Sequence, residues 1–288
     1  MTSYQTTKVL IQDSHTLPIY GTLYQTSDTQ SAHKPTIFYL HGGGLVFGQR
    51  NDLPEQYITM LTNAGYNLFT VDYPLAPESK LSEILSSIEQ SITWFETNAV
   101  DQLHLNNKAF ILMGRSAGAY LAIYQAVYHQ SKAKGLIAFY GYFNLNEAAF
   151  NVPNRYFLTF PKVTDAQVAK LINDQPITQG EMNHRYPIYI SARQKGNWQS
   201  LYLEDDQSAT DFSIQKKALS SLPVSFIAAA TNDPDVPSRQ SKFLHNGNAN
   251  SELHLIESDQ HDFDRTDIDT LGVDIYEKLI TWLDKNFS

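Results

Sequence analysis

The sequence predicts an α/β fold with a mostly parallel central sheet covered by helices on both faces. Short continuous apolar runs, such as residues 36–40 and 135–140, are typical of strands that are buried on both sides. Segments with helical periodicity alternate with these runs, and strands that alternate with helices favour a parallel sheet. Between Tyr140 and Val224 this alternation stops for roughly 80 residues, far longer than an ordinary loop, which predicts an inserted segment.

The composition fits a globular chain of 288 residues, with 42% hydrophobic and 18% charged residues. A formal net charge of −9 argues against nucleic acid or an anionic membrane as partner, because both require a basic surface. The absence of cysteine excludes disulfides and thiolate metal sites. Because we see neither a secretory signal pattern nor an apolar run near the ~20 residues that cross a bilayer, we expect a cytoplasmic protein without membrane insertion.

The first part of the chain supplies a leading hairpin, a polar linker, two buried strands and one helix. Proline is well tolerated in the first turn of a helix, which places the start of that helix at Pro54. The expected ranges are 7–11 and 17–24 for the hairpin, 25–34 for the linker, 36–40 and 66–71 for the strands, and 54–63 for the helix.

The next helix is the clearest one, because its apolar residues recur at helical spacing along one face. These residues are Leu81, Ile84, Leu85, Ile88, Ile92 and Phe95. Further buried strands are expected at 109–113, 135–140, 224–229 and 252–256, with a buried helix at 119–124. The chain closes with a helix that carries Leu271, Ile275, Leu279, Trp282 and Leu283 on one stripe.

We interpret residues 141–215 as a cap inserted over the ends of the strands, with residues 1–140 and 216–288 forming the core. A capping-box pattern from Thr164 to Gln167 predicts a short helix through Ile172. Disorder would be the alternative, but disordered segments contain few aromatic residues. The insertion contains Phe143, Phe150, Tyr156, Phe157, Phe160, Tyr186, Tyr189, Trp198 and Tyr202.

The stretch from Gly114 to Gly118 reads G-x-S-x-G and stands between a predicted strand and a predicted helix. In that context the pattern predicts a tight turn that exposes the hydroxyl of Ser116 as a nucleophile. Glycine is required on both sides because neighbouring side chains would collide in such a turn. The backbone N–H of Ala117 would then point to where a tetrahedral oxyanion forms.

A serine hydroxyl needs a base to remove its proton and an acid to orient that base. Of the nine histidines, only His261 occupies the loop after the last predicted strand, and we expect it to be the base. Asp233 directly follows the preceding strand, and Pro234 restricts it to extended conformations that suit a carboxylate at a strand end. Asp233 is therefore the expected acid, whereas Asp235 is interpreted as a loop or helix-start residue that hydrogen-bonds the local backbone.

The glycines after His41 predict the other half of the site. A glycine run lets the backbone approach a substrate and turn its N–H groups toward it. Gly42 and Gly43 are expected to complete an oxyanion hole with Ala117, while His41 holds the loop by hydrogen bonds.

Together these motifs resemble the hormone-sensitive-lipase-like carboxylesterases of the α/β-hydrolase fold. The matching stretches are His41-Gly42-Gly43-Gly44, Asp72-Tyr73-Pro74-Leu75-Ala76-Pro77-Glu78, Gly114-Arg115-Ser116-Ala117-Gly118, Asp233-Pro234 and His261-Asp262-Phe263. The resemblance implies the nucleophile, acid, base and oxyanion roles given above. The chain departs from the family pattern at Arg115, where Asp or Glu is common, at Pro74, where Arg is usual, at Asp235, where Leu is usual, and at Asp262, where Gly is common.

We expect a serine carboxylesterase that hydrolyses small to medium acyl esters through an acyl-enzyme intermediate, without cofactor or metal. An aminopeptidase, amidase or formamidase with the same triad stays open, and Glu181 or residues 204–206 could then bind an amine. A non-catalytic binder on the same scaffold is disfavoured because the base is present. An exposed edge strand near the C-terminal end could pair two chains into a homodimer.

Overall fold

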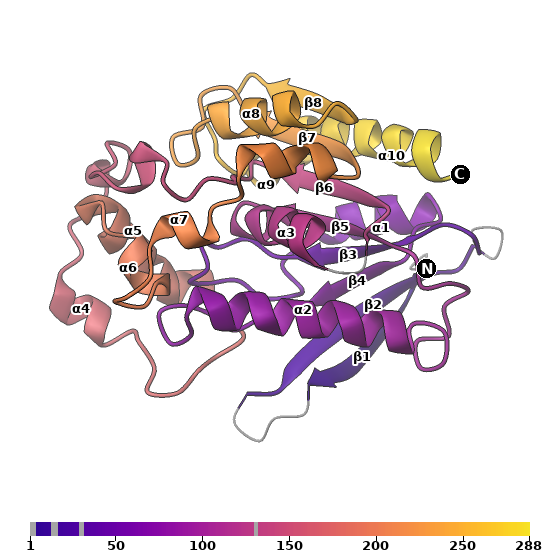
Figure 1. The fold of residues 1–288 in the computed structure, drawn as a ribbon, viewed down its shortest axis with the longest axis horizontal. Coiled ribbons are helices and arrows are strands. Elements are labelled where there is room, and N and C mark those ends of the chain that lie inside the picture. The colour runs from indigo at the N-terminus through magenta and orange to yellow at the C-terminus, as the bar shows by residue number, and fades with distance from the viewer. Residues whose placement is uncertain (1–3, 13–16, 29–31, 130–131) are drawn as a thin grey trace.

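The computed structural model describes residues 4–12, 17–28, 32–129 and 132–288, and within them the chain forms an eight-stranded sheet (Figure 1). The strand order is β1-β2-β4-β3-β5-β6-β7-β8. β1 and β2 are antiparallel to their neighbours, and all other pairs are parallel. The strands are β1 (Tyr4–Gln12), β2 (Ile19–Thr26), β3 (Thr36–Leu40), β4 (Leu68–Val71), β5 (Phe110–Arg115), β6 (Gly135–Phe139), β7 (Val224–Ala230) and β8 (Ser251–Ile256).

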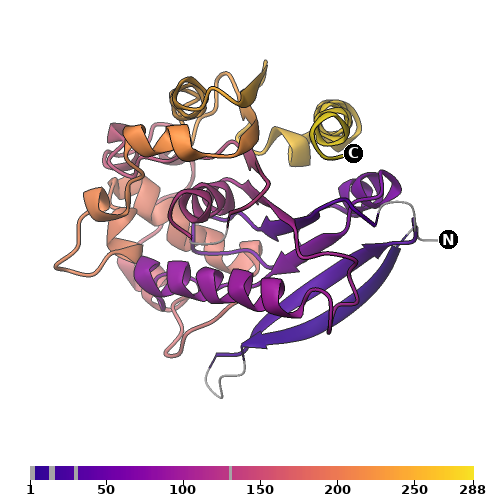
Figure 2. The same ribbon diagram turned by 45° about the vertical axis from the view of Figure 1, so that its right-hand side comes forward.

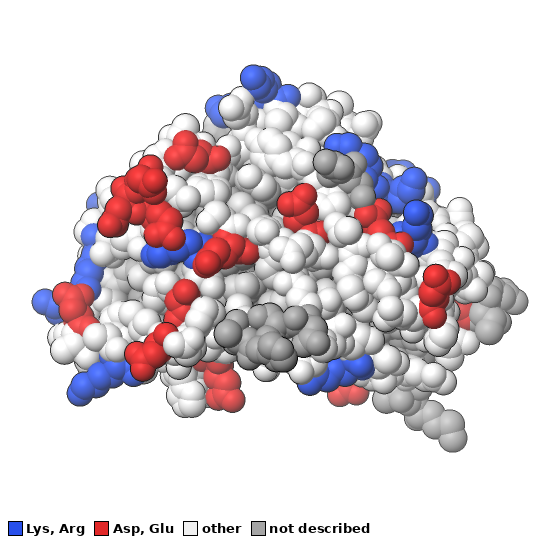
Figure 3. Space-filling model, turned by 60° about the horizontal axis from the view of Figure 1, so that its bottom comes forward, with Lys and Arg blue, Asp and Glu red and all other residues white. Residues whose placement is uncertain are grey.

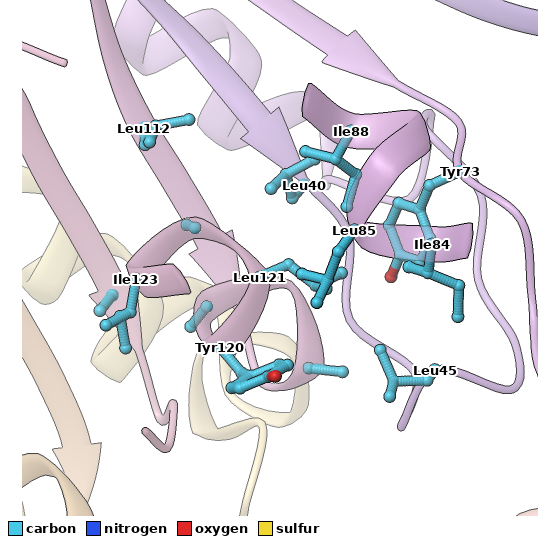
Figure 4. Packing of buried hydrophobic residues seen from close by; sticks show 14 of the residues in the cluster. Leu40, Leu45, Tyr73, Ile84, Leu85, Ile88, Leu112, Tyr120, Leu121 and Ile123 are labelled. Carbon is cyan, nitrogen blue, oxygen red and sulfur yellow. The ribbon is translucent and has the colours of Figure 1, made fainter. Parts of the chain in front are cut away.

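Helices cover both faces of this sheet because the central strands are apolar on both sides. Along β3, Phe38 and Leu40 belong to one buried cluster, whereas Ile37 and Tyr39 belong to a second cluster on the opposite face. Helices α2 (Leu81–Asn98) and α3 (Ala117–Tyr128) contribute to the first cluster, with Leu85 of α2 and Leu121 of α3 among its side chains (Figure 4). Helices α1 (Glu55–Asn63) and α10 (Val273–Phe287) contribute to the second.

The region between β6 and β7 contains a series of helices, most of which lie at one end of the sheet, away from the C-terminus (Figure 1). They comprise η2 (Ala148–Phe150), η3 (Phe157–Thr159), α4 (Asp165–Ala169), α5 (Met182–Lys195), α6 (Gln199–Tyr202), α7 (Ala209–Phe212) and η4 (Lys216–Ser221). After β7 come α8 (Arg239–Gly247), α9 (Phe263–Thr266) and a π-helical turn, Ile268–Gly272. The division into core and cap at residues 140 and 215 stays a prediction.

The structure corrects the sequence-based expectations at several helices. The helix predicted through Ile172 ends at Ala169, and Leu271 lies in the π-helical turn before α10. Helix α5 was not predicted, because it contains Pro187 and buries Arg185 and Arg193, which break an amphipathic pattern. Residues 29–31 of the predicted linker lie outside the described residues.

The edges and surface of the molecule bear on its partners. The β1–β2 hairpin forms one edge of the sheet and projects beyond α2 (Figure 2), and β8 forms the other edge. Pairing of two chains through β8 stays a prediction.

On the face shown in Figure 3, acidic and basic side chains are interspersed. Among the described residues, every helix is too short or too polar to cross a membrane.

Candidate active site

Ser116 occupies a strained turn between β5 and α3. Its φ of 52° and ψ of −119° lie in a region that residues with a side chain rarely adopt. The flanking glycines allow this turn, since a Cβ on Gly114 would lie 2.1 Å from the carbonyl oxygen of Gly118. A Cβ on Gly118 would in turn lie 2.2 Å from the carbonyl oxygen of Leu40. The packing of α3 against β3 and β5 therefore exposes the serine at the carboxyl end of the sheet.

His261 bridges the serine and a carboxylate that are far apart in the sequence. Its Nε2 lies 2.8 Å from Oγ of Ser116, and its Nδ1 lies 2.6 Å from Oδ2 of Asp233. With the ring proton on Nδ1, the imidazole donates to Asp233 and accepts from the serine hydroxyl. Oδ1 of Asp233 accepts the backbone N–H groups of Asp235 and Val236 at 2.8 and 2.9 Å, which fixes the carboxylate.

Several carboxylates determine the protonation of His261. Burial lowers the pKa of its imidazole, but the negative charges of Asp233, Asp235 and Asp262 outweigh this effect and raise the pKa to about 9. The ring of Tyr140 packs edge-on against the imidazole, with ring centroids 4.8 Å apart. An imidazolium at this position is thus strongly stabilised.

The glycine loop after β3 lies directly beside Ser116. A Cβ on Gly42 would lie 3.0 Å from the carbonyl oxygen of Arg115. Gly43 adopts a φ of 105°, where a side chain would collide with the carbonyl of Phe47. The N–H of Ala117 begins α3 and has no acceptor within that helix. All three residues predicted to donate to an oxyanion therefore lie around the serine.

His41 holds the glycine loop by hydrogen bonds, as expected from the sequence. Its Nδ1 lies 2.8 Å from the carbonyl oxygen of Gly42 and 3.1 Å from the hydroxyl of Tyr73. The imidazole also stacks on the ring of Tyr73 and is fully buried. Burial lowers the pKa of His41, which favours its neutral form.

A cavity of about 450 Å³ opens above Ser116. Aromatic side chains form much of its wall: Phe47, Tyr140, Tyr156, Phe157, Tyr186 and Tyr189. Glu181 also lines it, whereas residues 204–206 are not part of the lining. Within the part of the chain that the structure describes, His, Asp and Glu side chains do not form a cluster able to hold a metal ion.

Asp235 behaves differently from the expectation for a local loop residue. Its carboxylate accepts the hydroxyl of Tyr189 at 2.9 and 3.0 Å and forms an ion pair with Arg193 at 3.0 Å. Both partners belong to α5, more than 40 residues away in the sequence. The local backbone N–H groups instead donate hydrogen bonds to the carboxylate of Asp233. Sequence reasoning missed Tyr189 and Arg193, because it did not predict α5.

A buried ion pair underlies the turn at Ser116. Nη2 of Arg115 lies 3.0 Å from Oδ1 of Asp264, and both side chains are almost completely buried. The hydroxyl of Tyr140 accepts from Nε of Arg115 at 2.6 Å and donates to Asp264 at 2.8 Å. This network joins the end of β5 to α9, which follows the loop of His261. The unusual residue Arg115 thus has its partner only three positions after the expected base.

Comparisons with known proteins identify the fold and the family. A family model described as alpha/beta hydrolase fold matches residues 37–265. A Staphylococcus aureus protein of unknown function is 30% identical over 99% of this chain and 100% of its own, with a TM-score of 0.83. An alpha/beta hydrolase superfamily protein from Enterococcus faecalis is 24% identical, over 98% and 99% of the two chains, with a TM-score of 0.84.

More distant structures share the fold. A hyperthermophilic esterase from Pyrobaculum calidifontis is 20% identical over 98% of this chain and 85% of its own, with a TM-score of 0.70. The match of the family model over most of the chain is decisive, because it includes the glycine loop, the G-x-S-x-G turn and the loops of Asp233 and His261. The chain therefore belongs to the α/β-hydrolase family, in its hormone-sensitive-lipase-like branch.

Proposed function

We propose that this protein is a serine carboxylesterase that hydrolyses small to medium acyl esters. The observation that carries the proposal is the hydrogen-bonded line from Ser116 through His261 to Asp233 at the base of the aromatic cavity. The esterase from Pyrobaculum calidifontis shares the fold of this chain, which is consistent with the proposed reaction class.

In the proposed mechanism, His261 removes the proton of Ser116 as Oγ attacks the ester carbonyl. The N–H groups of Gly42, Gly43 and Ala117 stabilise the oxyanion of the tetrahedral intermediate. The imidazolium, stabilised by Asp233, then protonates the departing alcohol and leaves an acyl-enzyme. Water attacks this acyl-enzyme with His261 again as base, which releases the acid and restores the serine.

The test is hydrolysis of p-nitrophenyl butyrate by the wild type and by Ser116→Ala. Removing a triad serine lowers turnover by roughly 10⁴- to 10⁶-fold. Ser86→Ala, at an exposed position on α2, is the matched control and should retain wild-type activity. A fluorophosphonate probe should label the wild type at Ser116. Equal activity of wild type and Ser116→Ala would reject Ser116 as the nucleophile. Absence of both hydrolysis and labelling would reject the proposal in favour of a non-catalytic binder.

The same triad could act on amides, as an aminopeptidase, amidase or formamidase. The observation that favours this alternative is Glu181 in the cavity wall, where a carboxylate could bind a substrate amine. Matched ester and amide substrates with the same acyl group distinguish the two reactions. A higher kcat/KM for the amide would replace the esterase assignment.

A further inference from the structure

Helix α5 contacts both loops that flank the predicted triad. On one side, the ring of Tyr189 covers Gly44, where an added Cβ would lie 2.4 Å from the ring. On the other side, Tyr189 and Arg193 bind the carboxylate of Asp235. The glycine loop and the acid loop are therefore held by one helix of the region between β6 and β7.

Arg193 is the most unusual residue of this helix. Its side chain has no solvent exposure, and its guanidinium lies 5.4 to 6.0 Å from four aromatic rings. Those rings belong to Phe150, Phe157, Tyr189 and Trp198. Nε and Nη1 have no hydrogen-bond partner among the described residues. A buried charge is costly unless it is compensated, and Asp235 supplies the carboxylate that compensates it.

The contact of Arg193 with Asp235 reaches the expected acid through the backbone. Nη2 of Arg193 binds both the carboxylate and, at 3.0 Å, the carbonyl oxygen of Asp235. The N–H of the same residue donates to Oδ1 of Asp233, whose Oδ2 binds His261. Fixing residue 235 therefore fixes the carboxylate that orients the imidazole.

We propose that Arg193 and Asp235 are positioning residues, through which α5 holds the carboxylate of Asp233 in line with His261. Asp235 has a second effect, because its negative charge contributes to raising the pKa of His261. This inference rests on the proposed function only where it is tested by the kinetics of ester hydrolysis. In the family pattern that the sequence resembles, leucine is usual at the position of Asp235, so this chain departs from that pattern here.

Several charged and titratable groups surround His261. They are Asp233 and Asp235 after β7, Asp262 in the same loop, Tyr140 after β6 and the Arg115–Asp264 pair that binds Tyr140. Asp235→Asn removes one negative charge and keeps the side-chain shape. It should therefore lower the pKa of His261, and the acidic limb of kcat/KM should move to lower pH.

The experiment compares Asp235→Asn, Arg193→Met and the double variant with the wild type. The titration of His261 is followed by NMR of its imidazole nitrogens without substrate, and kcat and KM are measured on p-nitrophenyl butyrate. Arg193→Met should lower kcat by on the order of 10- to 100-fold with little change in KM, since a small displacement of catalytic groups is costly. The double variant should be no worse than Arg193→Met, because coupled residues are not additive.

Arg185→Met is the matched control, since Arg185 is also a buried arginine of α5 but pairs with Glu78 at 2.6 Å. It should lower stability without moving the titration of His261. Arg193→Lys keeps the positive charge and should therefore recover part of the kcat that Arg193→Met loses. It replaces Arg193→Met in the experiment if that variant does not fold.

An unchanged titration of His261 in Asp235→Asn would overturn the electrostatic part of the inference. The positioning part would be overturned if the losses in kcat of Asp235→Asn and Arg193→Met multiplied in the double variant. A change in KM without a change in kcat would also overturn it. If the wild type hydrolyses no ester, the proposed function fails, whereas the NMR titration still tests the electrostatic effect of Asp235 on His261.

Discussion

Oγ of Ser116 and Nε2 of His261 lie 2.8 Å apart, although 145 residues separate them in the sequence. The parallel order β5-β6-β7-β8 produces this contact, because it brings the loops after β5, β7 and β8 to the same edge of the sheet. Asp233 follows β7 and completes the line from the opposite side of the imidazole.

The first prediction concerns pH. A base must be unprotonated to accept the serine proton, and the pKa of His261 is raised to about 9. We therefore expect kcat/KM for p-nitrophenyl butyrate to increase with pH through the neutral range and to level off only above about 9. A profile between pH 5 and 10, corrected for spontaneous hydrolysis, measures this. A plateau that begins near pH 6.5, the ordinary value for histidine, would contradict the prediction.

The second prediction concerns the acid. Asp233→Asn keeps the shape of the side chain but favours the wrong tautomer of His261, and in other serine hydrolases the equivalent change lowers kcat by about 10⁴-fold. We expect a loss of this order, measured by steady-state kinetics. Asp259→Asn changes an exposed carboxylate near His261 in the sequence and should have little effect. Similar kinetics of the two variants would exclude Asp233 as the acid.

The third prediction concerns stability. Arg115→Met leaves the carboxylate of Asp264 buried without its cation, which typically costs about 3–5 kcal/mol. Urea unfolding should show this loss, and Arg115→Met combined with Asp264→Asn should recover part of it. The control is Arg239→Met, which removes a half-exposed partner of Glu147 and should cost roughly 1 kcal/mol or less. Equal losses in both single variants would show that burial does not strengthen the Arg115–Asp264 pair.

The fourth prediction concerns acyl-chain preference. Tyr186 lines the cavity, and its ring packs against Phe47 with centroids 5.5 Å apart. Tyr186→Ala should enlarge the cavity and shift the ratio of kcat/KM for p-nitrophenyl octanoate over acetate by several-fold toward octanoate, about the value of one buried methylene group. Tyr128→Ala, at an exposed tyrosine outside the cavity, should leave this ratio unchanged. An unaltered ratio in Tyr186→Ala would place the acyl chain elsewhere.

Local sequence patterns were sufficient to predict most of the core. The strand at 36–40 and the helix beginning at Leu81 were found because burial on two faces or on one face leaves a periodic apolar signature. The turn at Ser116 and the glycine loop were found because their backbone conformations require glycine at fixed positions. These features depend on residues that are close together in the sequence, so they can be recognised from the sequence alone.

The partners of Asp235 and Arg115 were decided only by the tertiary structure. Asp235 reads as a loop residue, and α5 carries no amphipathic pattern, yet the fold brings Arg193 against the loop of Asp233. Arg115 likewise gives no local sign that it will meet Asp264. A buried charge is stabilised by a side chain distant in the sequence, so its role is set by packing. The sequence by itself determined the fold and the reactive residue types, whereas tertiary packing decided what holds them in line.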